Sequence, residues 1–303
     1  MWQASEKIAF AGGALDRAVH LREDGGAERL RGGGDSRVVL VGNGQEVAVT
    51  GELALALVPV DAVPDGAELT FLGLDSGAAL FAHDAAAGAP ETCQTVTLAP
   101  LRGLADELEP AQAALAAYAV GLIGWHRVQR YCGRCASATV IEAAGHRRHC
   151  PVCGLNHFPR TDPAITMLVQ AADRCLLSRR RGAPENRWSA LAGFVEPGET
   201  PEEAVIREAR EETGVEVVWI EYVASQPWPF PQALMIGFWA FVDPDTADGP
   251  PTPDAAELVD ARWWGRDELA GALGAGDIVL PPPGTIGNYL ISTWLAGGAA
   301  PTP

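Results

Sequence analysis

A glycine turn followed by an acidic helix constrains this chain more than any other feature. The turn is Gly193-Phe-Val-Glu-Pro-Gly-Glu199, and the acidic stretch is Arg207-Glu-Ala-Arg-Glu-Glu-Thr-Gly-Val215. Thr200 can cap the start of a helix, and Glu203, three residues later, completes a capping box. Gly214 supplies a C-terminal stop, because glycine readily takes the left-handed conformation. The sequence therefore predicts a short capped helix between residues 200 and 214.

Three carboxylates on that helix have the spacing of a cation site. Glu208 and Glu212 lie one turn apart, and Glu211 lies beside them. Like charges at this spacing are mildly destabilising, so the arrangement makes most sense with a cation between them. A solvated acidic helix face is the usual meaning of a charge run, but it does not explain the full spacing G-x5-E-x7-R-E-x2-E-E-x-G.

That spacing matches the Nudix box at every required position, and the region resembles the Nudix hydrolases, which cleave nucleoside diphosphates linked to another group. The resemblance implies an α+β protein containing an α/β/α sandwich whose box helix carries the metal ligands. It implies that Mg²⁺ or Mn²⁺ is held by Glu208, Glu211, Glu212 and the backbone carbonyl of Ala192. Glu257 matches a further ligand of the family, although an ordinary surface acid at a strand entry is the alternative there.

Four of the six cysteines form a second pattern. Cys132 and Cys135 make one C-x2-C pair, Cys150 and Cys153 make another, and fourteen residues separate the pairs. Four thiolates can close a tetrahedron around a structural Zn²⁺ and leave no position for water. A pair of disulfides is one alternative, and a cytosolic setting disfavours it. A redox C-x-x-C is the other, and it would need only one pair. The sequence therefore predicts a zinc ribbon.

A proline-aromatic segment, Ser225-Gln-Pro-Trp-Pro-Phe-Pro-Gln-Ala-Leu-Met235, forms the third pattern. Alternating prolines stiffen the backbone and hold Trp228 and Phe230 on an extended loop. Such a loop can wall a pocket for a flat heteroaromatic ring, with Gln226 and Gln232 supplying polar contacts. Taken alone, the segment would fit a rigid connector between strands equally well.

After a Nudix box, this segment resembles the S-Q-P-W-P-F-P-x-S array of the NADH pyrophosphatases, the Nudix branch that cleaves NAD(H). That branch has a divergent N-terminal domain, a zinc ribbon, the box, the array and a late P-P-P-G-T segment, here Pro281-Pro-Pro-Gly-Thr-Ile-Gly287. All five parts occur in this order. Two positions depart from the pattern: Ala233 replaces a serine, and Phe158 replaces a tyrosine. Both departures bear on specificity rather than on the metal site.

The resemblance also implies roles for individual residues. Glu211 is the nominal general base, and Arg207 orients the acids by ion pairing, so that the implied catalytic set is Arg207, Glu208, Glu211 and Glu212. The arginine at 102 matches an N-terminal-domain arginine of the family only if one gap is allowed. The implied substrate contacts are Arg102, Phe158, Phe194, Gln226, Pro227, Trp228, Pro229, Phe230, Pro231, Gln232, Ala233 and Gly287.

We expect four segments along the chain: a β-rich, Nudix-like N-terminal domain over 1–124, a zinc ribbon over 125–160, a catalytic domain over 161–296 and a loose tail over 297–303. The first has a predicted helix over 111–125 and a hairpin turning at Asp75-Ser-Gly77. In the catalytic domain we expect a hairpin turning at Asp173, strands over 215–223, 234–242 and 261–264, a surface loop over 243–256 and a helix over 286–295.

Composition narrows the classes of partner. The chain has 303 residues and a net charge of −17, which argues against binding nucleic acid through its overall field. A local basic surface is still compatible with this charge, built from Arg127, Arg130, Arg134, Arg147 and Arg148 around the ribbon. The N-terminus lacks signal-peptide features and no apolar run could span a bilayer, so we expect a cytoplasmic protein. The resemblance implies a homodimer.

Three functions compete at this point. The first is hydrolysis of NAD(H) to nicotinamide mononucleotide and AMP. The second uses the same chemistry on other substrates: the 5′-NAD cap of RNA, or nucleoside diphosphate derivatives more broadly. The third is a zinc-ribbon binding module whose Nudix part is inert, and the intact box glutamates argue against it.

Overall fold

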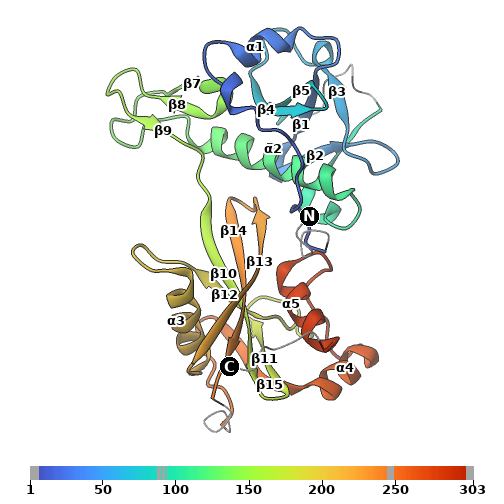
Figure 1. The fold of residues 1–303 in the computed structure, drawn as a ribbon, viewed down its shortest axis with the longest axis vertical. Coiled ribbons are helices and arrows are strands. Elements are labelled where there is room, and N and C mark those ends of the chain that lie inside the picture. Colours follow the sequence, from blue (N-terminus) through green and yellow to red (C-terminus); the bar gives the residue numbers. More distant parts are fainter. Residues whose placement is uncertain (1–6, 87–89, 91–92, 94, 244–248, 298–303) are drawn as a thin grey trace. The chain divides into compact units, whose positions relative to one another are not determined.

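The computed structural model describes residues 7–86, 90, 93, 95–243 and 249–297. It divides into two compact units (Figure 1). The first holds Ala9–Thr161 together with Pro227–Gln232, and the second holds Asp162–Gln226 and the chain from Ala233 on. Each unit is described by itself below.

A six-stranded sheet forms the centre of the first unit. Its strand order is β4-β5-β1-β2-β6, with β3 paired to β1, and the β1–β5 pair is parallel. A second, three-stranded sheet of order β7-β8-β9 follows it in the chain. The elements of the unit are α1 (Gly26–Arg31), β1 (Arg37–Val41), β2 (Glu46–Val49), β3 (Leu57–Pro59), β4 (Leu69–Asp75), β5 (Ala78–Asp84), β6 (Thr97–Pro100), α2 (Pro110–Val128), β7 (Val140–Glu142), β8 (Arg147–His149) and β9 (Asn156–His157).

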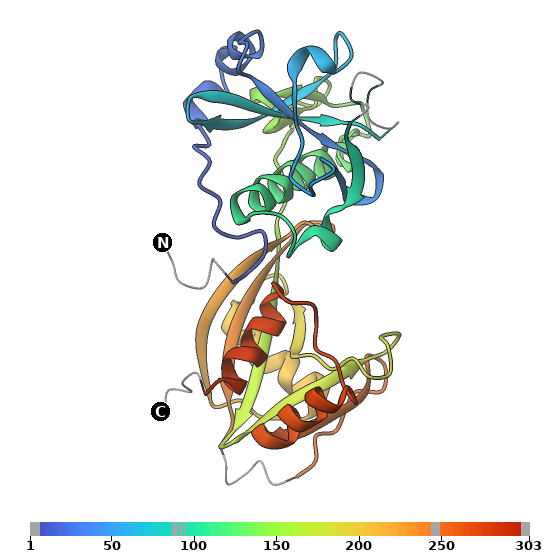
Figure 2. The ribbon, with the colours of Figure 1, turned by 90° about the vertical axis from the view of Figure 1, so that its right-hand side faces the viewer.

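Helix α2 covers one face of the large sheet (Figure 2). It starts at Pro110, where the missing N–H costs no hydrogen bond, and it continues through alanines that favour helix and permit close packing. Ala116, Val120 and Ile123 lie in one buried cluster with Val39 and Leu72 of the sheet. The helix predicted over 111–125 is therefore confirmed.

The predicted hairpin at Asp75-Ser-Gly77 is also confirmed, as the turn between β4 and β5. Ser76 and Gly77 have φ values of 50° and 90°. Two consecutive residues with positive φ are what a two-residue hairpin turn requires, and glycine adopts this conformation without strain. Cys93 is buried in the same unit.

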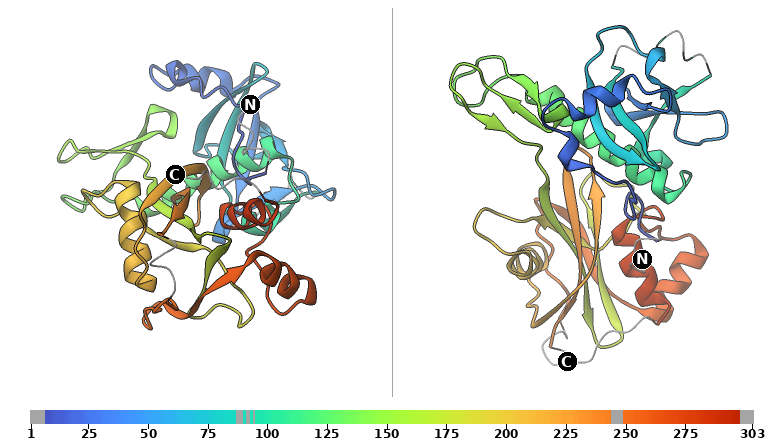
Figure 3. Two further views of the ribbon diagram at one scale, coloured as in Figure 1. Left: turned by 60° about the horizontal axis from the view of Figure 1, so that its bottom comes forward. Right: turned by 45° about the horizontal axis from the view of Figure 1, so that its top comes forward.

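A mixed sheet between helices forms the second unit (Figure 3). Its order is β13-β14-β10-β11-β15, β12 also pairs with β10, and the β10–β14 pair is parallel. The elements are β10 (Asp162–Ala171), β11 (Arg174–Arg180), β12 (Leu191–Phe194), α3 (Pro201–Thr213), β13 (Trp219–Trp228), β14 (Ala233–Phe241), β15 (Leu258–Gly265), α4 (Arg266–Ala275) and α5 (Ile286–Leu295).

The two faces of this sheet bury separate cores, because successive residues of a strand point to opposite faces. Met167 packs in one cluster with Val205 of α3, whereas Leu168 packs in another with Leu290 of α5. The β-strands thus lie between α3 on one side and α4 and α5 on the other, the expected α/β/α sandwich. Cys175 is fully buried in the second cluster.

Several predicted elements match the observed ones closely. The hairpin at Asp173 joins β10 to β11, the strand over 261–264 lies inside β15, and the helix over 286–295 is α5. The residues of the expected surface loop that the structure describes, 243 and 249–256, contain no helix or strand, and 244–248 lie outside the described part. Of the expected tail, only Gly297 is described, so that prediction is not tested.

Two predictions in the second unit need correction. The strand expected over 215–223 begins only at Trp219 and continues to Trp228, so the first half of the proline-aromatic segment is strand rather than loop. The segment's turn is confined to 229–232, before β14 begins at Ala233. Helix α4 was not predicted, because Gly271 and Gly274 each lower helix propensity by about 1 kcal/mol relative to alanine. Among the described residues, no helix is long and apolar enough to cross a membrane.

A buried polar network joins α2 to the three-stranded sheet. Arg148 of β8 donates from Nη1 to Nδ1 of His126 at 3.0 Å and from Nε to Thr139 Oγ1 at 2.8 Å. Nε2 of His126 then donates to the carbonyl of Gly145 at 2.9 Å. Burial, with the neighbouring Arg148 charge, lowers the pKa of His126 to about 4. The imidazole is therefore neutral in the folded protein at neutral pH.

This network makes the stability of the first unit depend on pH. The folded-state pKa of His126 lies below its ordinary value of 6.5, so unfolding takes up about one proton between pH 4 and 6.5. Stability should therefore fall as the pH is lowered through this window. We expect His126→Asn, which can still accept from Arg148, to reduce the proton uptake by about one, measured as the slope of unfolding free energy against pH. His20→Asn, at an exposed position, is the control, and an unchanged slope in His126→Asn would contradict the assignment.

Candidate active site

Helix α3 begins and ends as predicted. The Thr200 hydroxyl accepts a hydrogen bond from the Glu203 N–H at 3.2 Å, and the Glu203 carboxylate accepts one from the Thr200 N–H at 2.7 Å. Pro201 occupies the first helical position, and Gly214 ends the helix with φ 70°. These local interactions fix the start of the helix, and with it the direction in which the box glutamates project.

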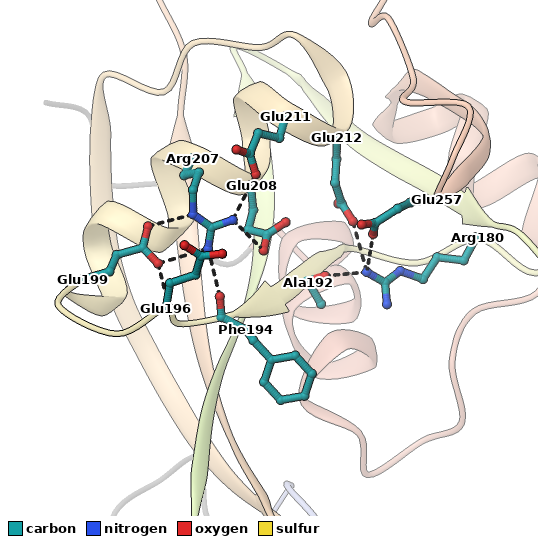
Figure 4. A network of polar contacts seen from close by, with 10 residues as sticks. All are labelled: Arg180, Ala192, Phe194, Glu196, Glu199, Arg207, Glu208, Glu211, Glu212 and Glu257. Atoms are coloured by element: carbon teal, nitrogen blue, oxygen red, sulfur yellow. Dashed lines mark hydrogen bonds and ion pairs between the residues drawn. The ribbon is translucent and has the colours of Figure 1, made fainter.

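Arg207 holds three carboxylates of this region (Figure 4). Its guanidinium donates to both oxygens of Glu199, at 2.8 and 3.0 Å, and to Glu208 and Glu211 at 2.9 and 3.0 Å. A further bond runs to the carbonyl of Phe194 at 2.9 Å. Hydrogen bonds to Glu199 first, and then to the other two acids, raise the pKa of Arg207. One cation thus ties Glu208 and Glu211 to the turn that precedes the helix.

A second group of oxygens surrounds Arg180, at the end of β11. Its Nη2 atom lies 2.6 Å from the carbonyl oxygen of Ala192, 3.0 Å from Oε1 of Glu212 and 3.6 Å from Oε2 of Glu257. Figure 4 shows Glu212 and Glu257 converging on this guanidinium. Ala192, Glu212 and Glu257 were predicted as metal ligands, and the structure brings their oxygens together. Arg180 was not among the predicted site residues.

Glu212 is the most deeply buried of these acids, with 3% of its side chain exposed. Its second oxygen, Oε2, has no hydrogen-bond partner among the described residues. Burial raises the pKa of Glu212 to about 7, against the opposing hydrogen bond from Arg180. A buried carboxylate oxygen without a partner is costly unless a cation or a proton meets it. The donor set therefore fits a hard divalent cation, which prefers carboxylate and carbonyl oxygens.

Gly193 shows how closely β12 and α3 approach each other. A Cβ atom at this position would lie 1.9 Å from Oε1 and 2.0 Å from Cδ of Glu208. An alanine here would force the Glu208 carboxylate to move, whereas glycine lets that carboxylate rest against the strand. The spacing pattern of the sequence includes this glycine, although the pattern gives no reason for it.

The two aromatic residues of the proline-aromatic segment, Trp228 and Phe230, lie in the first unit. The rings of Trp228 and Phe230 meet edge-on with centroids 4.9 Å apart. The guanidinium carbon of Arg102 lies 5.3 Å from the Trp228 centroid and 4.9 Å from that of Phe230. Phe10, which the sequence interpretation missed, also packs on both rings. Arg102 therefore contacts both aromatics, and its role as a substrate contact stays a prediction.

The remaining predicted substrate contacts have mixed surroundings. Phe158 and Phe194 are 60% and 62% exposed, so both rings are accessible. Gln226 is 1% exposed. Its amide donates to the carbonyl of Gly284 and accepts from the N–H of Ile286, both at 2.9 Å. We therefore correct the expectation for Gln226, because these bonds commit its side chain to the fold.

The other predicted substrate contacts differ in how far they are exposed. Within the segment, Pro229 is buried, Pro227 and Pro231 are exposed, and Gln232 and Ala233 are half-buried. Gly287 lies in the first turn of α5, next to the N–H that binds Gln226. Nothing in the sequence pattern distinguishes a residue that holds the segment in place from one that meets a ligand.

The four cysteines of the ribbon converge. Their sulfur atoms all lie within 4.8 Å of one another. Cys132 and Cys153 are 3.6 Å apart at sulfur, and Cys135 and Cys150 are 3.5 Å apart. Four sulfurs at these separations fit a tetrahedral Zn²⁺ with no open position, which is a structural rather than a catalytic site.

The basic surface expected around the ribbon needs correction. Arg148 is buried in the network with His126, Arg127 is paired with Asp84, and Arg147 is paired with Glu23 and Glu142. Arg130 and Arg134 remain exposed. Fewer cationic side chains therefore face solvent than the clustering of arginines in the sequence suggests, because folding uses three of them internally.

Three family models match successive parts of the chain. The model of the NUDIX domain matches residues 160–280, that of the NADH pyrophosphatase-like rudimentary NUDIX domain matches 35–125, and that of the NADH pyrophosphatase zinc ribbon domain matches 127–158. A Nudix hydrolase structure from Nitrosomonas europaea aligns at 20% identity with a TM-score of 0.42, covering 55% of this chain and 91% of its own.

Two curated relatives are described as NAD-capped RNA hydrolase NudC. That of Mycobacterium tuberculosis strain H37Rv is 37% identical over 307 aligned positions, covering 93% of this chain and 92% of its own. That of Chromobacterium violaceum is 40% identical over 231 positions, covering 75% and 82%. The fold and the box define a Nudix hydrolase. Within that class, the chain belongs to the NADH pyrophosphatase family, with its rudimentary N-terminal Nudix domain and its zinc ribbon.

The approach of β12 to α3 gives a direct test of the site. We expect Gly193→Ala to displace the Glu208 carboxylate, since the added Cβ cannot share its space. A displacement of about 1 Å should lower kcat/KM about a hundredfold while the protein remains folded. Gly271→Ala is the matched control, because a Cβ there meets nothing within 4 Å. Equal activity of the two variants would show that the Glu208 position does not matter.

Proposed function

We propose that this protein is a metal-dependent hydrolase that cleaves the pyrophosphate of NAD(H) to nicotinamide mononucleotide and AMP. The observation that carries the proposal is the convergence of Glu212, Glu257 and the Ala192 carbonyl, with the unpaired Oε2 of buried Glu212 beside them. Glu208 and Glu211 add two further carboxylates from the same helix. Mg²⁺ or Mn²⁺ would be held by these oxygens.

Pyrophosphate hydrolysis requires that the charge on the phosphoryl oxygens be neutralised and that the attacking water be aligned with the phosphorus. Cleavage puts a water on phosphorus while a phosphate leaves, so charge accumulates on the phosphoryl oxygens. Divalent cations, when bound, neutralise that charge and lower the pKa of the attacking water. Arg207 contributes by fixing Glu208 and Glu211 before substrate arrives. Glu211 is the proposed proton acceptor, because its side chain is 61% exposed and so reachable by water, whereas that of Glu208 is 13% exposed.

Selection of NAD(H) is assigned to the proline-aromatic segment. Trp228 and Phe230, with Arg102 over both rings, offer flat apolar faces beside a positive charge. A nicotinamide ring can stack on such a surface, and the charge suits a phosphate. Phe194 and Phe158 are exposed aromatic rings that also suit stacking. We retain the segment, without the Gln226 side chain, as the proposed base-binding wall.

Removal of 5′-NAD caps from RNA is the second candidate. The names of the relatives at 37–40% identity support it, because those proteins are described as NAD-capped RNA hydrolases. Exposed Arg130 and Arg134 are the arginines left to meet an RNA backbone near the ribbon. The cytoplasmic location and the homodimer expected from the sequence stay predictions.

An assay of matched substrates tests the proposal. NADH, ADP-ribose and NAD-capped RNA at equal concentration should all be hydrolysed only with Mg²⁺ or Mn²⁺, and NADH should give nicotinamide mononucleotide and AMP. Glu212→Gln removes one ligand charge and should abolish most turnover while the fold persists. A kcat unchanged in this variant at saturating metal would refute the metal site, and an inert wild-type protein would favour the binding-module alternative.

The aromatic wall has its own test. Stacking of a base on an aromatic ring is worth about 1–3 kcal/mol, which is roughly five- to over a hundredfold in affinity. We therefore expect Phe230→Ala to raise KM for NADH far more than KM for ADP-ribose, which lacks the nicotinamide ring. Because Phe230 also packs on Phe10, the melting temperature must be measured alongside. Equal losses on both substrates would show that the segment only supports the fold, leaving a hydrolase of broader nucleoside-diphosphate specificity.

A further inference from the structure

Arg180 stands where a metal ion would be expected to bind. A single nitrogen, Nη2, contacts oxygens from three separate elements: Ala192 on β12, Glu212 on α3 and Glu257 just before β15. Arg180 itself ends β11. Figure 4 shows the guanidinium pointing into the space between the two carboxylates and the β12 carbonyl. One positive group therefore gathers the same oxygens that the proposed function gives to a divalent cation.

The contacts of Arg180 show its guanidinium taking the place of a metal cation among these oxygens. Oxygens from three segments approach one positively charged group, as they would approach a metal ion. The side chain of Glu212 is only 3% exposed. A carboxylate so buried needs a positive partner, because an uncompensated buried charge is strongly unfavourable. In this structure Arg180 is that partner. A metal ion bound to these same three oxygen atoms would stand beside the guanidinium, and the repulsion between the two positive charges disfavours having both at once.

The two arginines of the site differ in how firmly they are held. Arg207 has 23% of its side chain exposed and binds Glu199 and the Phe194 carbonyl, neither of which is a proposed metal ligand. Arg180 has 48% of its side chain exposed, and its guanidinium contacts only proposed ligands among the described residues. A long, half-exposed side chain can move its charged end into solvent at little cost. Arg180 is therefore the arginine that a metal ion can displace.

We propose that Arg180 is a tethered counter-ion of the metal site: it pairs with Glu212, Glu257 and the Ala192 carbonyl and must leave them before a divalent cation binds. The inference rests on the proposed metal site. Competition of this kind lowers apparent affinity by the fraction of molecules whose ligands are free. If the guanidinium is seated in about nine molecules of ten, removing it should tighten metal binding about tenfold. The same removal should destabilise chelated protein, because Glu212 would lose its partner.

Direct measurement of Mn²⁺ binding tests this proposal without reference to turnover. Full-length protein is freed of metal by a chelator, and free Mn²⁺ is followed by electron paramagnetic resonance during titration. The site to be counted is the one lost in Glu212→Gln. We expect Arg180→Gln to lower the Mn²⁺ dissociation constant about tenfold and to lower the melting temperature of the chelated protein, with added Mn²⁺ closing that gap.

Two further variants separate a seated guanidinium from a general effect of charge. Arg180→Lys keeps the charge without the planar fork, so its Mn²⁺ affinity should fall between wild type and Arg180→Gln. Arg181→Gln removes the same charge from the next residue, whose side chain bonds the Ala255 carbonyl, and should change affinity less than about twofold.

The outcomes distinguish this inference from the proposed function. Unchanged or weaker Mn²⁺ binding by Arg180→Gln, with the site intact in wild type, would overturn the counter-ion role alone. Equal tightening in Arg181→Gln would also overturn it, because the effect would then be one of net charge. If wild type lacked the site that Glu212→Gln removes, both the metal site and this inference would be wrong.

Discussion

The gathering of carboxylates at the junction of β12 and α3 is the constraint on which the rest of the second unit depends. Five acids converge there, and two arginines, Arg180 and Arg207, partly neutralise them. Acids at this density repel one another unless cations lie among them. The capping box fixes the helix, Gly193 admits the Glu208 carboxylate, and burial withholds water from Glu212. The buried Glu212 oxygen without a partner among the described residues is the costly feature, and the proposed cation would offset that cost.

The first unit holds the proline-aromatic turn and the four-cysteine ribbon. Its large sheet and α2 form one core, and the four-cysteine ribbon is linked to α2 through Arg148 and His126. The proline-aromatic turn packs within this unit, against Phe10 and Arg102. The proposed wall for a flat ring is thus held by residues that lie more than a hundred positions away in sequence. Chemistry and ring recognition are assigned to different sets of contacts, so substitutions can affect one and spare the other.

Elements with local signals were predictable from the sequence. The capped helix at Thr200, the hairpin at Ser76-Gly77 and the helix over 286–295 each depend on neighbouring residues, and each matches the structure. The prediction was weaker where tertiary contacts decide. Strand β13 extends through the proline-bearing segment, and it can do so because it lies at the edge of the sheet beside β14, where proline is tolerated.

The sequence by itself determined the box spacing, the four-cysteine pattern and the family, because each is a set of residue types at fixed separations along the chain. Only the tertiary structure decided the partners: Arg180 with Glu212 and Glu257, Phe10 with the aromatic pair, and Arg148 buried instead of exposed. An arginine carries the same charge wherever it stands in a sequence. Which oxygens it contacts depends on strands and helices from distant segments that pack together on folding. The spacing of neighbouring residues in the sequence does not specify that packing.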